Sequence, residues 1–140
     1  MKILFDTNIL LDLLLMRKPY YESVAQLISF VETRMIEGWL CPNTVSTVHY
    51  LLNEALDKQQ AAGHLKTILS MYRVPELNQA VFNQAALGEY SDYDYALTYQ
   101  SALQADVDGI LTRNREHYSD SSLPVCTPDK LLALMNSLET

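Results

Sequence analysis

Apolar residues occur along the chain in two alternating patterns, which are short continuous runs and longer segments with apolar residues at helical spacing. Short apolar runs of the buried-strand type occupy residues 2–5, 39–41, 73–75, 109–111 and 124–126. Between them, apolar residues recur three, four and seven positions apart, which predicts amphipathic helices. These stripes mark helices at 9–18, 20–37, 45–55, 65–71, 81–85, 92–103 and 128–138, with Gly38 ending the second and Ser91 capping the sixth. Strands that alternate with helices are typical of an α/β domain with a mostly parallel sheet.

The first apolar run indicates the layering of this domain. Residues 3–5 are all apolar, which is expected of a strand covered on both faces. We therefore predict a three-layer α/β/α sandwich with a mostly parallel central sheet, in which residues 2–5 form a central strand. The chain has 140 residues, four glycines and no repeat or low-complexity linker. This predicts one domain that spans residues 1–140.

The composition restricts the classes of function. The chain carries 10 Lys and Arg against 17 Asp and Glu, a net charge of −7. Because phosphate binding depends on clustered basic residues, a general nucleic-acid coat protein is excluded, and a nucleic-acid enzyme would need a metal ion to supply positive charge. Cys41 and Cys126 match no zinc or redox spacing, which favours free thiols. No export signal or membrane segment is evident, so we expect a cytoplasmic protein.

Polar residues follow the predicted strands where ligand sites form in parallel sheets. Asp6, Thr7 and Asn8 follow the first strand, residues 112–114 follow the strand at 109–111, and Asp92 opens a helix with Asp94. We expect these three segments to converge at one edge of the sheet. Each has a simpler alternative, because Asp6 also suits a helix N-cap and the other two aspartates suit a first helical turn.

Four segments of the chain resemble one family. They are Phe5–Asp12 (FDTNILLD), Asp92–Leu97 (DYDYAL), Ile110–Asn114 (ILTRN) and Pro124–Leu132. In this order and spacing they resemble the PIN domain family, which includes the VapC-type toxins. The resemblance implies a Rossmann-like α/β/α fold, ribonuclease activity that depends on Mg²⁺ or Mn²⁺, and in bacteria often the toxin of a toxin–antitoxin pair. An RNA substrate and an antitoxin partner follow from it.

The resemblance also implies roles for individual residues. Asp6, Asp94 and Thr112 would be catalytic, and Asp6, Asp94 and Asp92 would hold the metal. Asn8 and Asn114 would support that site. The charge and position of the next residues, rather than the resemblance, suggest further roles: Glu116 and His117 could add support, and Arg113 and Arg115 could guide the RNA backbone. Carboxylates suit this chemistry, because Mg²⁺ takes one or two of them and keeps several waters.

The sequence departs from the family pattern at three acidic positions. Thr47, Tyr95 and His117 stand where the family has acids. Glu54 is on the same helical face as Thr47 but about 10 Å further along, so it is a poor substitute. Each lost charge weakens the attraction for a cation. We therefore expect the metal to be weakly bound.

Three alternatives remain open from the sequence. The chain could be a PIN-fold protein that binds RNA or protein without turnover, or a phosphatase in which Asp6 attacks phosphorus, although Asn8 stands where those enzymes place a second aspartate. The tyrosines 90, 93, 95 and 99 could stack on unpaired bases or pack in the core. An apolar patch with Met16 and Trp39 would favour a homodimer.

Overall fold

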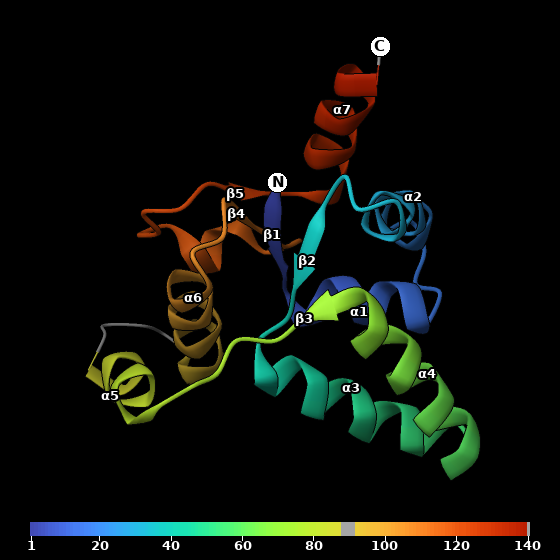
Figure 1. Cartoon of the computed structure of the whole chain (residues 1–140), viewed down its shortest axis with the longest axis horizontal. Helices are drawn as coiled ribbons and strands as arrows, with labels where there is room; N and C mark the ends of the chain where they lie inside the picture. The colour runs from blue at the N-terminus through green and yellow to red at the C-terminus, as the bar shows by residue number, and fades with distance from the viewer. Residues whose placement is uncertain (88–91, 140) are drawn as a thin grey trace.

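The computed structural model describes residues 1–87 and 92–139, and its centre is a parallel five-stranded sheet. The strands are β1 (Lys2–Phe5), β2 (Glu37–Trp39), β3 (Tyr72–Arg73), β4 (Gly109–Leu111) and β5 (Val125–Cys126). They lie in the order β3-β2-β1-β4-β5, and every neighbouring pair is parallel (Figure 1). The predicted α/β fold and the central position of the first strand are confirmed.

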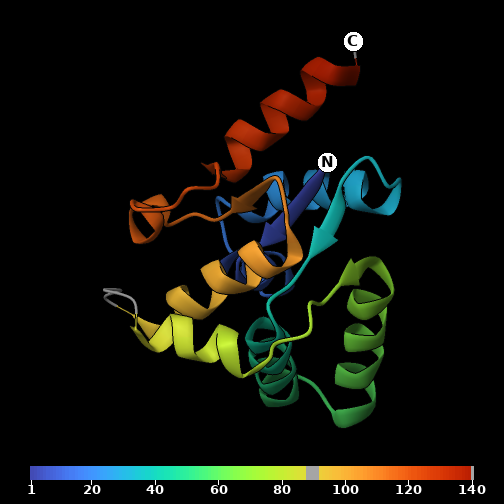
Figure 2. The same ribbon diagram turned by 60° about the vertical axis from the view of Figure 1, so that its left-hand side comes forward.

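Helices cover both faces of this sheet. They are α1 (Thr7–Leu14), α2 (Tyr21–Glu32), α3 (Pro42–Ala55), α4 (Lys58–Met71), α5 (Gln79–Leu87), α6 (Tyr93–Ala105), the short 3₁₀ helix η1 (Arg115–Tyr118) and α7 (Pro128–Glu139). Side chains alternate along β1, so Ile3 and Phe5 pack with α1, α2 and α7, whereas Leu4 packs with α6 and η1. Figure 2 shows α5 lying beside α6 on the second side. Among the described helices, none is both long and apolar enough to cross a membrane.

Gly38 does not end a helix, as the sequence analysis predicted, but lies inside β2. Helix α2 stops at Glu32, and the turn after it places Arg34 in the left-handed region with φ 65°. A Cβ at Gly38 would lie 2.5 Å from ring atoms of Tyr72 on the neighbouring strand β3. The glycine therefore permits the Tyr72 ring to lie directly on the backbone of β2.

Several other boundaries also differ from the prediction. Strand β2 lies at Glu37–Trp39 instead of residues 39–41, helix α1 ends at Leu14 instead of residue 18, and helix α4 begins at Lys58 instead of residue 65. Strand β3 begins at Tyr72, one residue before the predicted run, because Tyr72 pairs with Gly38. Ser91 and Tyr90 lie outside the described residues, and the N-cap of α6 is Asp92, whose side chain accepts from the backbone N–H of Asp94 at 2.8 Å.

We expect Gly38→Ala to destabilise the protein by about 1–3 kcal/mol, because the added methyl overpacks against Tyr72. Gly63→Ala is the matched control, since a Cβ there meets nothing within 4 Å and the site is an exposed position of α4. In that helix alanine should stabilise by up to about 1 kcal/mol. Urea denaturation of both variants measures the difference, and equal effects would contradict the close contact.

Candidate active site

Strand pairing brings Asp6 and Thr112 together although 106 positions separate them. Phe5 on β1 is in register with Leu111 on β4, and Asp6 and Thr112 directly follow these two strands. The backbone N–H of Asp6 donates to the carbonyl of Leu111 at 2.9 Å. The Thr112 hydroxyl donates to Asp6 Oδ2 at 2.9 Å. The two side chains thus meet at the carboxyl end of the central strand, as the sequence analysis predicted.

The Asp6 carboxylate is buried, with 4% of the residue exposed, and is held by neutral donors. Its Oδ1 accepts from the backbone N–H of Thr7 at 2.8 Å, which caps α1. Its Oδ2 accepts from the Tyr118 hydroxyl at 2.9 Å and from the Asn8 amide at 3.5 Å, besides Thr112. Burial raises the pKa of Asp6, and the hydrogen bonds from Thr112, Tyr118 and Thr7 counteract part of that rise.

Asp12 on α1 is a second buried aspartate, and unlike Asp6 it has arginine partners in the described chain. Asp12 is fully buried, but Arg113 donates to both of its oxygens and Arg17 lies 3.6 Å away. Within residues 1–87 and 92–139, no Lys or Arg forms an ion pair with Asp6. Among the described residues Asp6 is therefore a buried carboxylate without a Lys or Arg partner, and the charge of His117 counteracts only the smallest part of its pKa rise. Such a buried charge is costly unless a cation or a proton compensates it.

The raised pKa of Asp6 predicts a pH effect on stability. Below the ordinary value of 3.8 the carboxyl is neutral in both folded and unfolded chains, and the contribution to stability is fully present. As pH rises through the higher folded-state pKa, the folded protein acquires the buried charge and this contribution is lost. Asp6→Asn has no such step, so its unfolding free energy relative to wild type should increase from pH 4 to pH 7 in metal-free urea titrations. A constant difference would contradict the shift.

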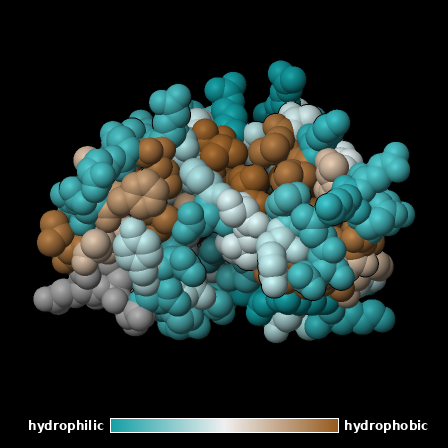
Figure 3. Space-filling model, turned by 90° about the horizontal axis from the view of Figure 1, so that it is seen from below, coloured by the Kyte–Doolittle hydropathy of each residue, from teal (hydrophilic) through white to brown (hydrophobic). Residues whose placement is uncertain are grey.

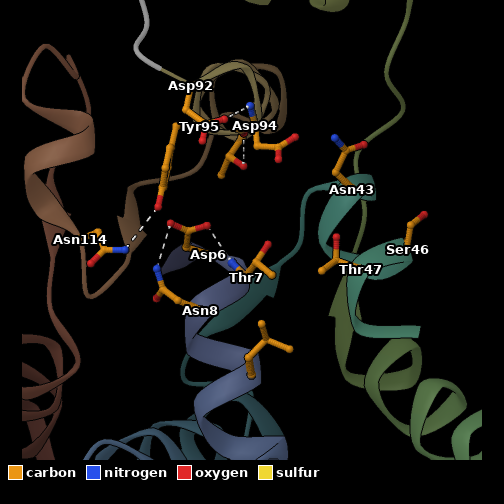
Figure 4. Close-up of a pocket in the computed structure, with 12 residues that line it drawn as sticks. Asp6, Thr7, Asn8, Asn43, Ser46, Thr47, Asp92, Asp94, Tyr95 and Asn114 are labelled. Carbon is orange, nitrogen blue, oxygen red and sulfur yellow. Dashed lines mark hydrogen bonds between the residues drawn. The ribbon is translucent and has the colours of Figure 1, made fainter. Parts of the chain in front are cut away.

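Asp6 lies in a polar pocket of about 390 Å³ between α1, α3 and α6 (Figure 4). The described residues that line it are Asp6, Thr7, Asn8, Leu11, Asn43, Ser46, Thr47, Asp92, Asp94, Tyr95, Thr98 and Asn114. None of these is Lys or Arg. Seen from below, the surface is hollowed near its middle, where hydrophilic and neutral residues gather (Figure 3). Such a pocket suits a cation or a neutral polar group better than a free anion.

The structure brings some of the predicted site residues together and separates others. Asp6, Asn8, Asp92, Asp94 and Asn114 line this pocket, and Thr112 lies behind Asp6. The Arg113 side chain contacts Asp12 and the ring of Tyr20 and borders a different pocket. Arg115 and Glu116 border a third hollow. The predicted guide for the RNA backbone and the support by Glu116 therefore lie outside the pocket of Asp6.

The α3 side of the pocket has no acid at the position where the family has one. Thr47 lines the pocket beside Asn43 and Ser46, so the α3 side is neutral, and Glu54 does not line it. In the described part of the chain, no three His, Cys, Asp or Glu side chains lie close enough to hold one metal ion together. A cation at Asp6 would therefore rely on few protein charges.

An aromatic cluster beside Asp6 went unnoticed in the sequence. The Tyr95 ring stacks on the His117 ring with centroids 4.0 Å apart and an interplanar angle of 6°, and Tyr118 packs edge-on against Tyr95 at 5.5 Å. Burial and the Asp6 charge raise the pKa of Tyr118, so its hydroxyl stays a donor to Asp6. The sequence analysis gave Tyr118 no role, because no sequence signal shows that its hydroxyl donates to Asp6.

Comparisons with known proteins give one family match and several solved structures of the same fold. A family model described as PIN domain matches residues 2–116. A toxin–antitoxin complex from Klebsiella pneumoniae is similar at 22% identity and TM-score 0.68, covering 90% of this chain and 97% of the other. VapBC-1 from nontypeable Haemophilus influenzae is similar at 12% identity and TM-score 0.68, with 92% and 99% covered. FitAB bound to the IR36 DNA fragment is similar at 18% identity and TM-score 0.67, with 90% and 94% covered. No curated protein matches the chain.

Proposed function

The chain belongs to the PIN domain family, and from this premise we propose that it is a metal-dependent endoribonuclease. In this proposal it is the toxin of a bacterial toxin–antitoxin pair and cleaves single-stranded or structured RNA in the cytoplasm. The observation that carries the proposal is the buried Asp6 carboxylate, which lines a polar pocket and pairs with no Lys or Arg of the described chain. A divalent cation would compensate this charge.

The donor atoms of the pocket suit Mg²⁺ or Mn²⁺. Asp6 Oδ1 accepts only the Thr7 N–H among the described residues, so it keeps a lone pair for a cation. In Figure 4 the Asp6 carboxylate points toward the first turn of α6, where Asp94 lies. Asp92 is engaged in capping, which leaves Asp94 as the second carboxylate for the ion. Hard cations prefer such oxygen ligands and keep several waters.

The protein groups around Asp6 prepare it for this role. When bound, the ion would supply an activated water and charge to offset the developing negative phosphorus centre. Thr112 and Tyr118 both donate to Asp6 Oδ2, which fixes the carboxylate orientation. Asn8 donates to Thr112 at 3.2 Å and accepts from the backbone N–H of Arg113 at 3.2 Å, so it ties α1 to the turn after β4.

Cleavage of RNA in defined metal conditions tests the proposal. Purified protein should cleave an unstructured fluorescent RNA in Mn²⁺ or Mg²⁺ and not in EDTA, and added Mn²⁺ should restore cleavage after chelation. Metal-independent cleavage that persists in EDTA would point to a contaminating nuclease or a different chemistry. No cleavage across varied RNA sequences and both metals would reject the enzymatic function.

The neutral α3 wall predicts weak metal binding and a way to strengthen it. We expect calorimetry to give Mn²⁺ affinity weaker than micromolar, because few carboxylates face the ion. Thr47→Glu should bind Mn²⁺ roughly ten-fold more tightly, equivalent to about 1.4 kcal/mol. Thr47→Gln is the matched control that adds the same length without charge. Micromolar binding by the wild type would contradict this prediction.

A PIN-fold protein that binds without turnover is the second candidate. It is favoured by the Tyr95–His117 stack, since an aromatic pair occupies two positions where the family has acids. RNA binding that is unaffected by EDTA, together with no cleavage, would select this candidate over the first.

We also propose protein partners for this chain. An antitoxin is expected because one similar structure is a toxin–antitoxin complex. A homodimer is expected because Leu15, Met16 and Tyr20 form an exposed apolar segment after α1. Light scattering should then give about twice the 15.9 kDa mass of the chain. A monomer mass at high concentration would reject the homodimer.

A further inference from the structure

We propose that Tyr95, backed by His117, is a platform on which one unpaired nucleobase of RNA stacks inside the pocket. This inference rests on the proposed RNA substrate but assigns a specificity residue that metal-dependent cleavage does not itself require. Tyr95 is on the first turn of α6 and lines the pocket beside Asp6. His117 is exposed and does not line it, so the imidazole covers the ring face that is turned away from the pocket.

The Tyr95 ring is fixed in place before any ligand arrives. His117 covers one face at 4.0 Å, the Tyr118 ring packs at 87° to it, and Asn114 donates to the Tyr95 hydroxyl at 3.3 Å. Figure 4 shows the ring edge-on, standing between Asn114 and the space above Asp6. A ring held this way loses little conformational entropy on binding, which favours stacking of a flat ligand on its pocket face.

The opposite wall offers hydrogen bonds that the protein does not use. Asn43, Ser46 and Thr47 of α3 line the pocket, and their side chains form no hydrogen bond with the rest of the described chain. Amide and hydroxyl groups both donate and accept, so they can pair with the edge of a base that stacks on Tyr95. A volume of about 390 Å³ is in the range of small-ligand pockets.

The charge of the pocket favours a base over a phosphate at this position. Asp6, Asp92 and Asp94 line the pocket, and among the described lining residues there is no Lys or Arg. A neutral base meets no repulsion there, and stacking on an aromatic ring contributes about 1–3 kcal/mol per base. The phosphate next to that base would then lie near the cation expected at Asp6. With Tyr95 and His117 in place of two acids, the pocket therefore binds a cation less tightly and a nucleobase more tightly.

A double-mutant cycle in EDTA tests the platform apart from cleavage. The probes are fluorescein-labelled 2′-O-methyl A₆ and U₆ hexamers, intact or with one abasic position, followed by anisotropy. Tyr95→Leu should weaken the intact probe about ten-fold, and Tyr95→Phe should stay within about two-fold. One abasic position should lower the affinity of wild type for the probe about ten-fold, and it should leave the affinity of Tyr95→Leu almost unchanged. Tyr50→Leu, at an exposed tyrosine outside the pocket, should bind like wild type.

The outcomes separate the platform from the enzymatic proposal. Equal abasic penalties in wild type and Tyr95→Leu, or no binding of either hexamer, would overturn the platform. Coupling between Tyr95 and one base, with no cleavage in any metal, would support the platform and reject the ribonuclease. If Tyr95→Leu does not fold, Tyr95→Phe and the abasic penalty of wild type still decide, because both use a folded protein, and absence of that penalty in wild type would overturn the platform.

Discussion

Asp6→Asn is expected to reduce metal-dependent RNA cleavage by roughly 10²–10³-fold and to remove detectable Mn²⁺ binding. The substitution keeps an oxygen to cap α1, since Asn is as good an N-cap as Asp, and it removes only the negative charge. Loss of one group that stabilises developing charge typically has an effect of this size. Steady-state cleavage and calorimetry with Mn²⁺ give the two readouts.

Two further variants make this experiment specific to the site. Asp120→Asn removes an exposed carboxylate that lines none of the described pockets, and it should leave both readouts unchanged. Asp94→Asn should raise the Mn²⁺ requirement with a smaller loss of maximal rate, because Asp94 lines the pocket without being buried. Full activity of Asp6→Asn would show that the buried carboxylate serves only to cap the helix.

The parallel sheet made the main features of the fold predictable. An all-apolar run such as Ile3–Phe5 fits only a strand covered on both faces, and parallel strands end at one edge. The meeting of Asp6 with Thr112 follows from these two facts alone. The prediction that Gly38 ends a helix was wrong, because a glycine that follows apolar residues at helical spacing is also typical of a helix C-terminus. Only the position of the Tyr72 ring shows that the glycine belongs to a strand.

The side-chain contacts of the site depend on the relative orientation of distant segments rather than on the hydrophobic pattern of the sequence. Tyr118 reaches Asp6 only because η1 turns the chain back after Asn114. The sequence shows that Tyr95 and His117 each stand at a position where the family has an acid. That the two rings stack depends on how close α6 lies to η1, which the sequence does not show. Hydrophobic periodicity carries no information on such contacts between distant segments, so the aromatic cluster could not be derived from the sequence.

The ion pair between Asp12 and Arg113 is expected to be the most sensitive polar contact of the fold. Arg113 donates to both carboxylate oxygens of Asp12, which is fully buried, and its guanidinium lies 4.1 Å from the Tyr20 ring centroid. The hydrogen bond to Asp12 raises the pKa of Arg113, so the guanidinium stays charged. It joins α1 to the turn after β4.

Arg113→Met should lower the free energy of unfolding by about 3 kcal/mol, because it leaves a buried carboxylate with only the longer contact to Arg17. Arg73→Met is the matched control: Arg73 pairs with Glu37 at 3.5 Å, but its side chain is 68% exposed, so the loss should stay below about 1 kcal/mol. The double variant with Asp12→Leu should recover much of the loss, since it removes the unpaired charge. Urea denaturation measures all three. Equal losses for the two arginines would show that the buried pair contributes no more than a surface contact.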